Sequence, residues 1–387
     1  MVNVLLESYD LTAPFLVDKL RPYIKPDSRV AIVAFSFLPS QASCLEEWLK
    51  LYGREEGMFY GWLVDPFAEF GVAQENITFV NYFADTKESA AQKVKEADIL
   101  YFTGGLPDAM MDRLYEFELV ELLKAFDGVV LGCSAGAMIQ LEEYHITPDW
   151  DYPSFGYYRG LPWLKDFYVE VHYEDTEEQN KSIRRVLEER NKPVYTTAHN
   201  NAAIIVDNGQ MQLLGDVKSF YPQIKTERLT VRQLEESDKQ AMVGLLTDDV
   251  IKKTYMLPDF ADPAQAENLF YRLMEYSRSA AHYIRGICLD GTVVGFLNDT
   301  EIENGAIELG WVMNPKYHNR GYMTEAVCAA IKDLFNRGFE TVLAGAFEEN
   351  PASIRVIEKC GMQMLEKTEE IEYRGKVHNC VFCAIKR

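Results

Sequence analysis

The chain has 387 residues, of which 48 % are hydrophobic and 26 % are charged, and this favours two folded domains over a disordered or fibrous chain. Its 60 acidic residues outnumber its 39 basic residues, the net charge is −21, and without a basic stripe we expect no nucleic-acid partner. We also expect no membrane partner, because no run has a membrane-spanning length, and a cytoplasmic location, because seven irregularly spaced cysteines fit a reducing compartment.

The first chemical feature along the chain is a pair of glycines after a predicted strand. Residues 97–102 form the strand, and Gly104 and Gly105 follow it. Pro107 is typical of the first turn of a helix, and Asp108 suits the positive end of the helix dipole. The segment therefore predicts a strand, a tight turn and a helix, as in an α/β domain.

Residues 128–139 predict a second strand, turn and helix, with Ser134 in the turn between Gly132 and Gly136. This is the nucleophile-elbow pattern, in which a sharp turn lifts the serine hydroxyl clear of the sheet. The N–H groups that begin the helix point to the place where an oxyanion would form. Cys133 lies one place from the centre of the pattern, and we expect it to be buried. Ser134 is thus a candidate nucleophile.

A serine nucleophile needs a general base, and three histidines lie in the same half of the chain. His172 ends a predicted strand at residues 167–173, and catalytic groups of open α/β sheets lie at such strand ends. His145 follows the elbow helix too closely to fold back easily. His199 lies in a turn before a predicted strand at residues 202–206. His172 and His199 thus remain candidates for the base.

Residues 1 to about 220 resemble the dipeptidase E and cyanophycinase family of serine peptidases. The resemblance is carried by residues 101–105, 132–137, 147–149 and 171–173, together with the last strands at 202–206 and 212–216. It implies a mostly parallel sheet flanked by helices. The catalytic triad that it implies is Ser134, His172 and Asp149, with Asp151 as the nearby alternative for the acid and Glu170 or Glu174 as weaker ones.

The same resemblance assigns the oxyanion hole to the backbone N–H groups of Gly105 and Ala135. The chain departs from the family at Leu106, where family members often carry asparagine. A backbone donor survives that change, whereas a contact of the asparagine side chain with the substrate amine would be lost. The preference of the family for aspartyl dipeptides is therefore in doubt for this chain.

A second domain is predicted from residue 222 onward. Pro222 follows the last strand of the first domain and cannot continue a central strand, so we divide the chain into residues 1–221 and 222–387. The second part predicts an α+β fold. Its expected elements are a strand at 226–232, a capped helix to about 246, strands near 283–289, 292–297 and 306–313, and a helix to about 337.

The loop before that last helix carries Arg320 and Gly321. Successive backbone N–H groups in such a loop and in the first helical turn bind anionic oxygens, and the helix dipole adds to the attraction. The loop is therefore a candidate cradle for a pyrophosphate.

Residues 224–387 resemble the GNAT acetyltransferases, most closely those that acetylate protein N-termini, on the segments 308–312, 318–323 and 350–362. The resemblance implies acetyl-CoA as the cofactor. The contacts that it implies are made by Trp311 and Val312 on a splayed strand, by His318, Asn319, Arg320, Gly321, Tyr322 and Met323 in the loop, and by Asn350 and Ser353 near the CoA arm. His318 and Met323 depart from the family pattern, but those contacts are mainly made by the backbone.

Acetyl transfer needs a base that deprotonates the amine and an acid that protonates the leaving thiolate. Glu308 is the candidate base, and Tyr373 is the candidate acid. Cys380 and Cys383 form a lone C-x-x-C pair in a predicted final strand, where we expect packing and no metal site.

We therefore predict a bifunctional enzyme that hydrolyses a small peptide or amide in its first domain and acetylates a small amine or peptide N-terminus in its second. Both steps on one compound would detoxify a peptide-like molecule. One alternative is that the first domain is a non-catalytic ligand sensor or dimerisation module, and a homodimer fits that alternative. Another is that only the peptidase is active and the second domain is regulatory.

Overall fold

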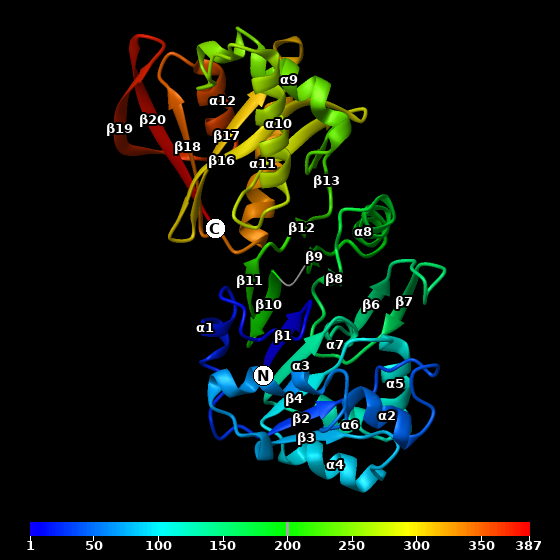
Figure 1. Ribbon diagram of the computed structural model, residues 1–387. Helices are drawn as coiled ribbons and strands as arrows, with labels where there is room; N and C mark the ends of the chain where they lie inside the picture. Colours follow the sequence, from blue (N-terminus) through cyan, green and yellow to red (C-terminus); the bar gives the residue numbers. More distant parts are fainter. Residues whose placement is uncertain (199–200) are drawn as a thin grey trace. The chain divides into compact units, whose positions relative to one another are not determined.

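The computed structural model describes residues 1–198 and 201–387. The chain divides into two compact units, Met1–Phe220 and Tyr221–Arg387, next to the boundary expected after residue 221 (Figure 1). Each unit has its own sheets and its own apolar core, and each is described by itself.

A seven-stranded sheet forms the centre of the first unit, in the order β11-β10-β1-β5-β4-β2-β3. Strands β1, β5, β4, β2 and β3 are parallel, whereas β10 near one edge pairs antiparallel with both β1 and β11. The strands are β1 (Val2–Leu6), β2 (Val30–Val33), β3 (Ile77–Val80), β4 (Ile99–Phe102), β5 (Val129–Cys133), β10 (Ala202–Asp207) and β11 (Gln210–Gly215). In this arrangement the carboxyl ends of β1, β4 and β5 lie at the same edge of the sheet.

Apolar side chains cover both faces of this sheet, because successive residues of a strand point to opposite faces. Tyr101 and Phe102, for example, belong to two different core clusters. The helical segments are α1 (Val17–Leu20), α2 (Leu45–Tyr52), α3 (Tyr60–Val64), η1 (Asp65–Phe70), η2 (Gln74–Asn76), α4 (Lys87–Glu96), α5 (Pro107–Glu116), α6 (Val120–Lys124), α7 (Ala135–Met138) and α8 (Glu177–Arg190). Two small sheets complete the unit: β12-β9-β8, made of β8 (Tyr168–Glu170), β9 (Val194–Thr196) and β12 (Ser219–Phe220), and the hairpin of β6 (Glu143–Ile146) and β7 (Gly156–Arg159).

The second unit is built on an eight-stranded sheet in the order β13-β14-β15-β16-β17-β18-β20-β19, in which only β17 and β18 are parallel. The strands are β13 (Ile224–Lys225), β14 (Thr230–Arg232), β15 (Arg285–Leu289), β16 (Thr292–Glu303), β17 (Ala306–Met313), β18 (Thr341–Phe347), β19 (Gln363–Tyr373) and β20 (Lys376–Lys386). The helical segments are η3 (Glu236–Asp238), α9 (Lys239–Thr247), η4 (Ile251–Lys253), α10 (Pro263–Ser277), η5 (Pro315–Tyr317), α11 (Tyr322–Asn336) and α12 (Pro351–Lys359).

The expected fold class is confirmed: the first unit is a mostly parallel α/β sheet, and the second is an α+β unit. The largest differences lie at strand ends. β8 ends at Glu170 rather than at residue 173, because His172 adopts a φ of +54° that breaks the strand. β16 extends to Glu303, beyond the expected residue 297. No helix in the described parts of the chain combines the length and apolarity needed to span a membrane.

Candidate functional sites

Ser134 lies in a strained turn between β5 and α7. Its φ of 51° and ψ of −110° are a conformation that residues with a Cβ rarely adopt. The flanking glycines allow the backbone to pass close by. A Cβ at Gly136 would lie 2.2 Å from the carbonyl oxygen of Phe102, and a Cβ at Gly132 would lie 2.0 Å from the carbonyl oxygen of Gly136. The elbow geometry therefore needs glycine at both places.

We expect Gly136→Ala to destabilise the first unit. The added methyl group meets the backbone of β4, which cannot move away as a flexible side chain can, and overpacking of this kind costs about 1–3 kcal/mol. A lower urea midpoint measures the loss. Gly61→Ala is the matched control, because the added Cβ meets only the Asp65 carboxyl group within 4 Å, and that side chain can rotate. A Gly136→Ala protein as stable as this control would contradict the tight contact between α7 and β4.

A hydrogen-bonded relay connects Ser134, His172 and Glu7. Ser134 Oγ lies 2.7 Å from Nε2 of His172, and Nδ1 of His172 lies 2.5 Å from Oε1 of Glu7. Oε2 of Glu7 accepts the backbone N–H of His172 at 3.0 Å and the hydroxyl of Thr197 at 2.9 Å. The Glu7 side chain is 8 % exposed, so its orientation is fixed by these bonds. The arrangement is that of a nucleophile, a base and an acid that orients the base.

The relay shifts the pKa values of both ionisable partners. The hydrogen bond to Glu7 is the main cause that raises the pKa of His172 above its ordinary value, and the negative charges of Glu7, Glu170 and Asp149 add to it. Burial alone would raise the pKa of Glu7, but its hydrogen bonds and its attraction to His172 outweigh burial and hold that pKa below the ordinary value. Glu7 is thus an anion that holds the His172 imidazole with Nε2 facing Ser134.

The structure places Glu7, and not Asp149, beside His172. Oδ1 of Asp149 accepts the backbone N–H groups of Asp151 and Tyr152 and so shapes the loop that follows β6. Asp151 is exposed, and Glu170 is hydrogen-bonded to His145 at 2.6 Å. These acids, like Glu174, form no recorded bond to His172. His199, the other histidine considered, lies outside the described residues.

Sequence reasoning missed Glu7, although a signal for it exists. Glu7 directly follows β1, and β1 pairs in parallel with β5, the strand that carries Ser134. An acidic residue at the carboxyl end of the neighbouring parallel strand is placed where catalytic groups of α/β sheets gather.

The backbone N–H groups expected to form an oxyanion hole are available. The N–H of Gly104 donates to Tyr9 and the N–H of Leu106 donates to Ser36, whereas no hydrogen bond to a described residue is recorded for the N–H of Gly105 or of Ala135. Gly105 has a φ of 140°, and a Cβ there would lie 2.2 Å from the carbonyl oxygen of Ser36. Only glycine fits that conformation.

Cys133 is buried beside this site, as expected. Burial raises the pKa of its thiol far above the ordinary value, and its Sγ donates to the carbonyl oxygen of Glu7 at 3.3 Å. A protonated, buried thiol is not a nucleophile. A cavity of about 900 Å³ adjoins Ser134 and Gly105, and it is large enough for a small peptide.

In the second unit, β17 and β18 separate after a short paired stretch. They pair only over Ala306–Glu308 and Thr341–Leu343, although β17 continues to Met313 along β16. Trp311 and Val312 therefore lie on the part of β17 that has lost its parallel neighbour. The edge left open there exposes backbone groups to which an extended ligand could bind.

The loop after β17 ends in a left-handed turn at the start of α11. Asn319 has a φ of 58°, and Gly321, the N-cap residue of α11, has a φ of 81°. No hydrogen bond to a described residue is recorded for the N–H groups of Arg320, Gly321, Tyr322 and Met323. Arg228 holds the loop in place, because it donates to the carbonyl oxygen of Arg320 at 3.0 Å and to Glu325. These free donors at a helix N-terminus fit an anionic ligand.

The remaining predicted residues have mainly local partners. Nε2 of His318 lies 2.9 Å from the carbonyl oxygen of Met313. The side chain of Asn350 accepts the N–H of Ser353 and caps α12. Burial raises the pKa of Glu308, which suits a base.

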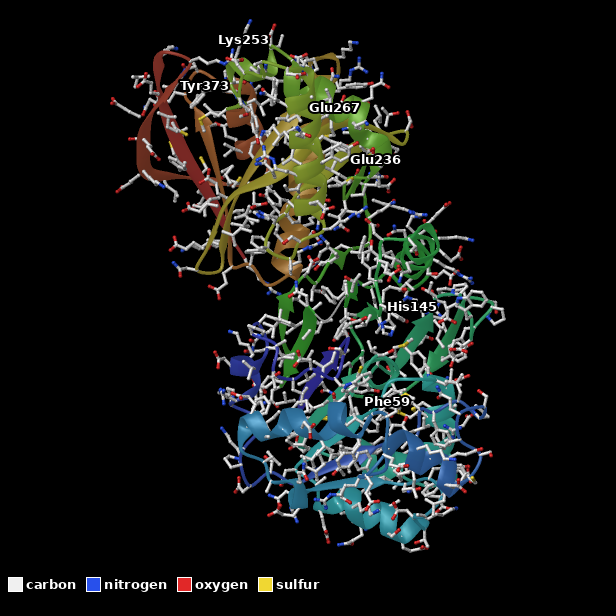
Figure 2. All side chains as sticks on the ribbon, viewed as in Figure 1. Phe59, His145, Glu236, Lys253, Glu267 and Tyr373 are labelled. Carbon is white, nitrogen blue, oxygen red and sulfur yellow. The ribbon has the colours of Figure 1, made fainter. Side chains whose placement is uncertain are left out.

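Tyr373 does not take the position expected of an acid. Its hydroxyl lies within 3.3 Å of the carbonyl oxygens of Lys252, Tyr255 and Leu257, and it holds that segment against β19. Figure 2 shows Tyr373, the last residue of β19, near Lys253. Because its proton is engaged by backbone acceptors, we assign it an anchoring role. Within the described residues, no group of three or more His, Cys, Asp or Glu side chains could hold a metal ion.

Comparisons with known proteins place each unit in a class of enzyme. Residues 64–214 match Peptidase family S51, and residues 228–363 match the family described as Acetyltransferase (GNAT) domain. The first unit thus carries a family S51 peptidase domain, and the second carries a GNAT acetyltransferase domain, as the sequence predicted. Both families are enzymes.

Among curated relatives, "Uncharacterized N-acetyltransferase YnaD" of Bacillus subtilis (strain 168) is 28 % identical over 144 residues, which are 36 % of this chain and 82 % of the relative. "Cobyrinate a,c-diamide synthase" of Methanocaldococcus jannaschii is 35 % identical over 81 residues, 21 % of this chain and 16 % of that protein. A solved GNAT acetyltransferase from Bacillus anthracis has 27 % identity and a TM-score of 0.38, and it covers 42 % of this chain and 98 % of its own. A ribosomal L7/L12 alpha-N-protein acetyltransferase in complex with coenzyme A has 17 % identity and a TM-score of 0.40, covering 42 % and 97 %.

Proposed function

We propose that the chain is bifunctional, with a serine hydrolase in the first unit and an acetyl-CoA-dependent amine acetyltransferase in the second. The relay of Ser134, His172 and Glu7 is the observation that carries the hydrolase proposal. Its three members come from three separate segments, and a hydrogen bond of 2.7 Å between a serine and a histidine is the distance that nucleophile activation needs. The S51 family match supports the same reaction class.

In the proposed hydrolysis, Ser134 Oγ attacks the carbonyl carbon of an amide while Nε2 of His172 takes its proton. The N–H groups of Gly105 and Ala135 stabilise the oxyanion, and Glu7 stabilises the imidazolium. His172 then gives the proton to the leaving amine, and an acyl-enzyme forms on Ser134. Water attacks that ester with His172 again as the base, which releases the acid and restores Ser134.

In the second unit, the loop 318–323 is proposed to hold the pyrophosphate of acetyl-CoA. The free N–H groups at the start of α11 and the left-handed Gly321 fit that anion, and the open edge of β17 at Trp311 and Val312 fits an extended chain. Asn350 and Ser353 are proposed to lie near the CoA arm. Acetyl-CoA supplies an acetyl thioester when bound. Glu308, whose pKa is raised by burial, is proposed as the base that deprotonates the acceptor amine.

We expect acetyl-CoA to raise the melting temperature of the second unit. At 100 times its dissociation constant a ligand of the folded state adds about 2.7 kcal/mol, which corresponds to several degrees for a domain of this size. Differential scanning fluorimetry measures the shift. S-acetylpantetheine lacks the pyrophosphate and is expected to give little shift at the same concentration, and Glu308→Gln should keep the acetyl-CoA shift but acetylate amines more slowly. An equal shift with S-acetylpantetheine would contradict a pyrophosphate site.

The rival proposal is that the first unit binds a ligand or dimerises without catalysis. Leu106 is the observation that favours it, since a substrate contact of the family is lost there. Amide hydrolysis that disappears in Ser134→Ala supports the enzyme, whereas ligand binding without turnover in the unchanged protein supports the sensor. Detoxification by hydrolysis and acetylation of one compound would require overlapping substrates, and two substrate screens without a shared compound would end that idea.

A further inference from the structure

Among its charged lining residues, the cavity beside Ser134 has five acids, and its basic side chains in the described part of the chain are the histidines His145 and His172. Its acidic lining residues are Asp149, Asp151, Glu170, Glu174 and Glu178. No lysine or arginine lines the cavity within the described residues. Charges on the wall of a cleft focus the electric field and raise the local concentration of oppositely charged ligands. The charge of the wall thus favours cations and disfavours anions at the catalytic serine.

Glu170 is the buried member of this wall. Its side chain is 4 % exposed. Glu170 is the last residue of β8, lies two residues before His172 and lines the cavity. Oε2 accepts hydrogen bonds from Nε2 of His145 at 2.6 Å and from the Thr147 hydroxyl at 2.8 Å. No described residue donates a recorded hydrogen bond to Oε1. A buried carboxylate with an open oxygen is costly unless a donor reaches it.

His145 is a second buried lining residue with an open polar atom. Its side chain is 0 % exposed, and Nδ1 has no hydrogen-bond partner among the described residues. When Nε2 carries the proton that is donated to Glu170, Nδ1 is an acceptor. Oε1 of Glu170 and the buried Nδ1 of His145 are then both acceptors, and Oε1 is the one that a donor-rich ligand in the cavity would meet. An ammonium group offers three donors, and a carboxylate offers none.

One further observation connects this wall to catalysis. The charges of Glu170 and Asp149 contribute to the raised pKa of His172, so they act at the base itself.

Resting on the hydrolase function proposed above, we propose that this cavity binds substrates whose acyl part carries a primary ammonium group, which pairs with Glu170. The ammonium is the side chain of a lysine-like residue. An acyl part with a negative side chain is rejected by the same wall, so aspartyl amides are poor substrates.

Hydrolysis of a matched series of fluorogenic amides by the full chain tests the proposal. The acyl groups are lysyl, norleucyl and aspartyl, each with a free and an acetylated α-amine. We expect the doubly charged lysyl amide to be cleaved best and the aspartyl amide least, with kcat/KM at least tenfold apart. A loss on exchange of lysyl for norleucyl that persists when the α-amine is acetylated identifies the side-chain ammonium as the ligand, and a loss on acetylation alone would overturn the proposal. Aspartyl amides cleaved as well as lysyl amides would overturn the proposal.

Glu170→Gln should lower kcat/KM for the cationic amide about 10- to 100-fold more than it lowers kcat/KM for the acetylated norleucyl amide. Glu177→Gln is the matched control, because Glu177 begins α8 but does not line the cavity. An unchanged rate of labelling by a fluorophosphonate shows that Glu170→Gln keeps its fold and its nucleophile. Equal losses for both amides would mean a structural role only and would overturn the proposal.

The dependence of amide turnover on salt tests the proposal on the unchanged protein, without a variant. Turnover of the cationic amide should fall as ionic strength rises, and turnover of the neutral one should not. Parallel responses of the two amides would overturn the proposal. A protein that neither labels with the fluorophosphonate nor cleaves any amide refutes the hydrolase function instead, and that outcome is distinct from a hydrolase without preference for charge.

Discussion

Ser134→Ala is expected to abolish amide hydrolysis by the first unit, with kcat reduced about 10⁴- to 10⁶-fold. The variant removes the hydroxyl whose Oγ lies 2.7 Å from Nε2 of His172, and the neighbouring Cys133 cannot replace it, because its thiol is buried and protonated. Steady-state hydrolysis of a small amide measures the change.

The acetyltransferase activity is the internal control for this variant, since Ser134 and the loop at Gly321 belong to different units. Acetylation of an amine by Ser134→Ala should match the unchanged protein. Hydrolysis that survives in the variant would show that another group performs the reaction, and the elbow would then be a structural turn.

Glu7→Gln is expected to lower kcat of the hydrolase about 10²- to 10⁴-fold. It should also move the acid limb of the profile of kcat/KM against pH to lower pH. A neutral amide cannot stabilise the imidazolium, so the main cause of the raised pKa of His172 is lost. The base works only when it is neutral, so hydrolysis by the unchanged protein should fall as pH drops through a pKa above the ordinary value of 6.5. In Glu7→Gln this fall should occur at a lower pH. Profiles of kcat/KM against pH measure both effects.

Asp149→Asn is the comparison that separates Glu7 from the acid expected from the sequence. Asp149 contributes a longer-range charge to His172 but no recorded hydrogen bond, so its variant should lose far less activity and shift the acid limb only slightly. A larger loss in Asp149→Asn than in Glu7→Gln would restore Asp149 to the triad.

The sequence predicted the fold of both units well, because the fold depends on local patterns. The strand, turn and helix around Ser134 follow from apolar residues next to glycines, and β17 was predicted with its observed limits at 306 and 313. Strand ends were harder, because the end of β8 is set by the positive φ of His172, which forms hydrogen bonds to a residue 165 positions away.

Which side chains contact each other in a site depends on such long-range contacts. The sequence therefore did not predict the contacts of Glu7, Asp149 and Tyr373. The pairing of β1 with β5 places Glu7 near Ser134, and the contact of Glu7 with His172 connects this sheet to the separate sheet that contains β8. Asp149 has the right residue type and spacing from Ser134, but its carboxylate is engaged by its own loop. Tyr373 likewise has the right chemistry for an acid, yet its hydroxyl is enclosed by the backbone at residues 252–257.

The central claim is that Ser134 is a nucleophile activated through His172 by Glu7. Intact-mass analysis after reaction with a fluorophosphonate tests it most directly, on the unchanged protein beside Ser134→Ala, Glu7→Gln and Asp149→Asn. The claim predicts one label on the unchanged protein and on Asp149→Asn at similar rates, slow labelling of Glu7→Gln and none on Ser134→Ala. An unlabelled protein, or a label that persists in Ser134→Ala, would contradict it.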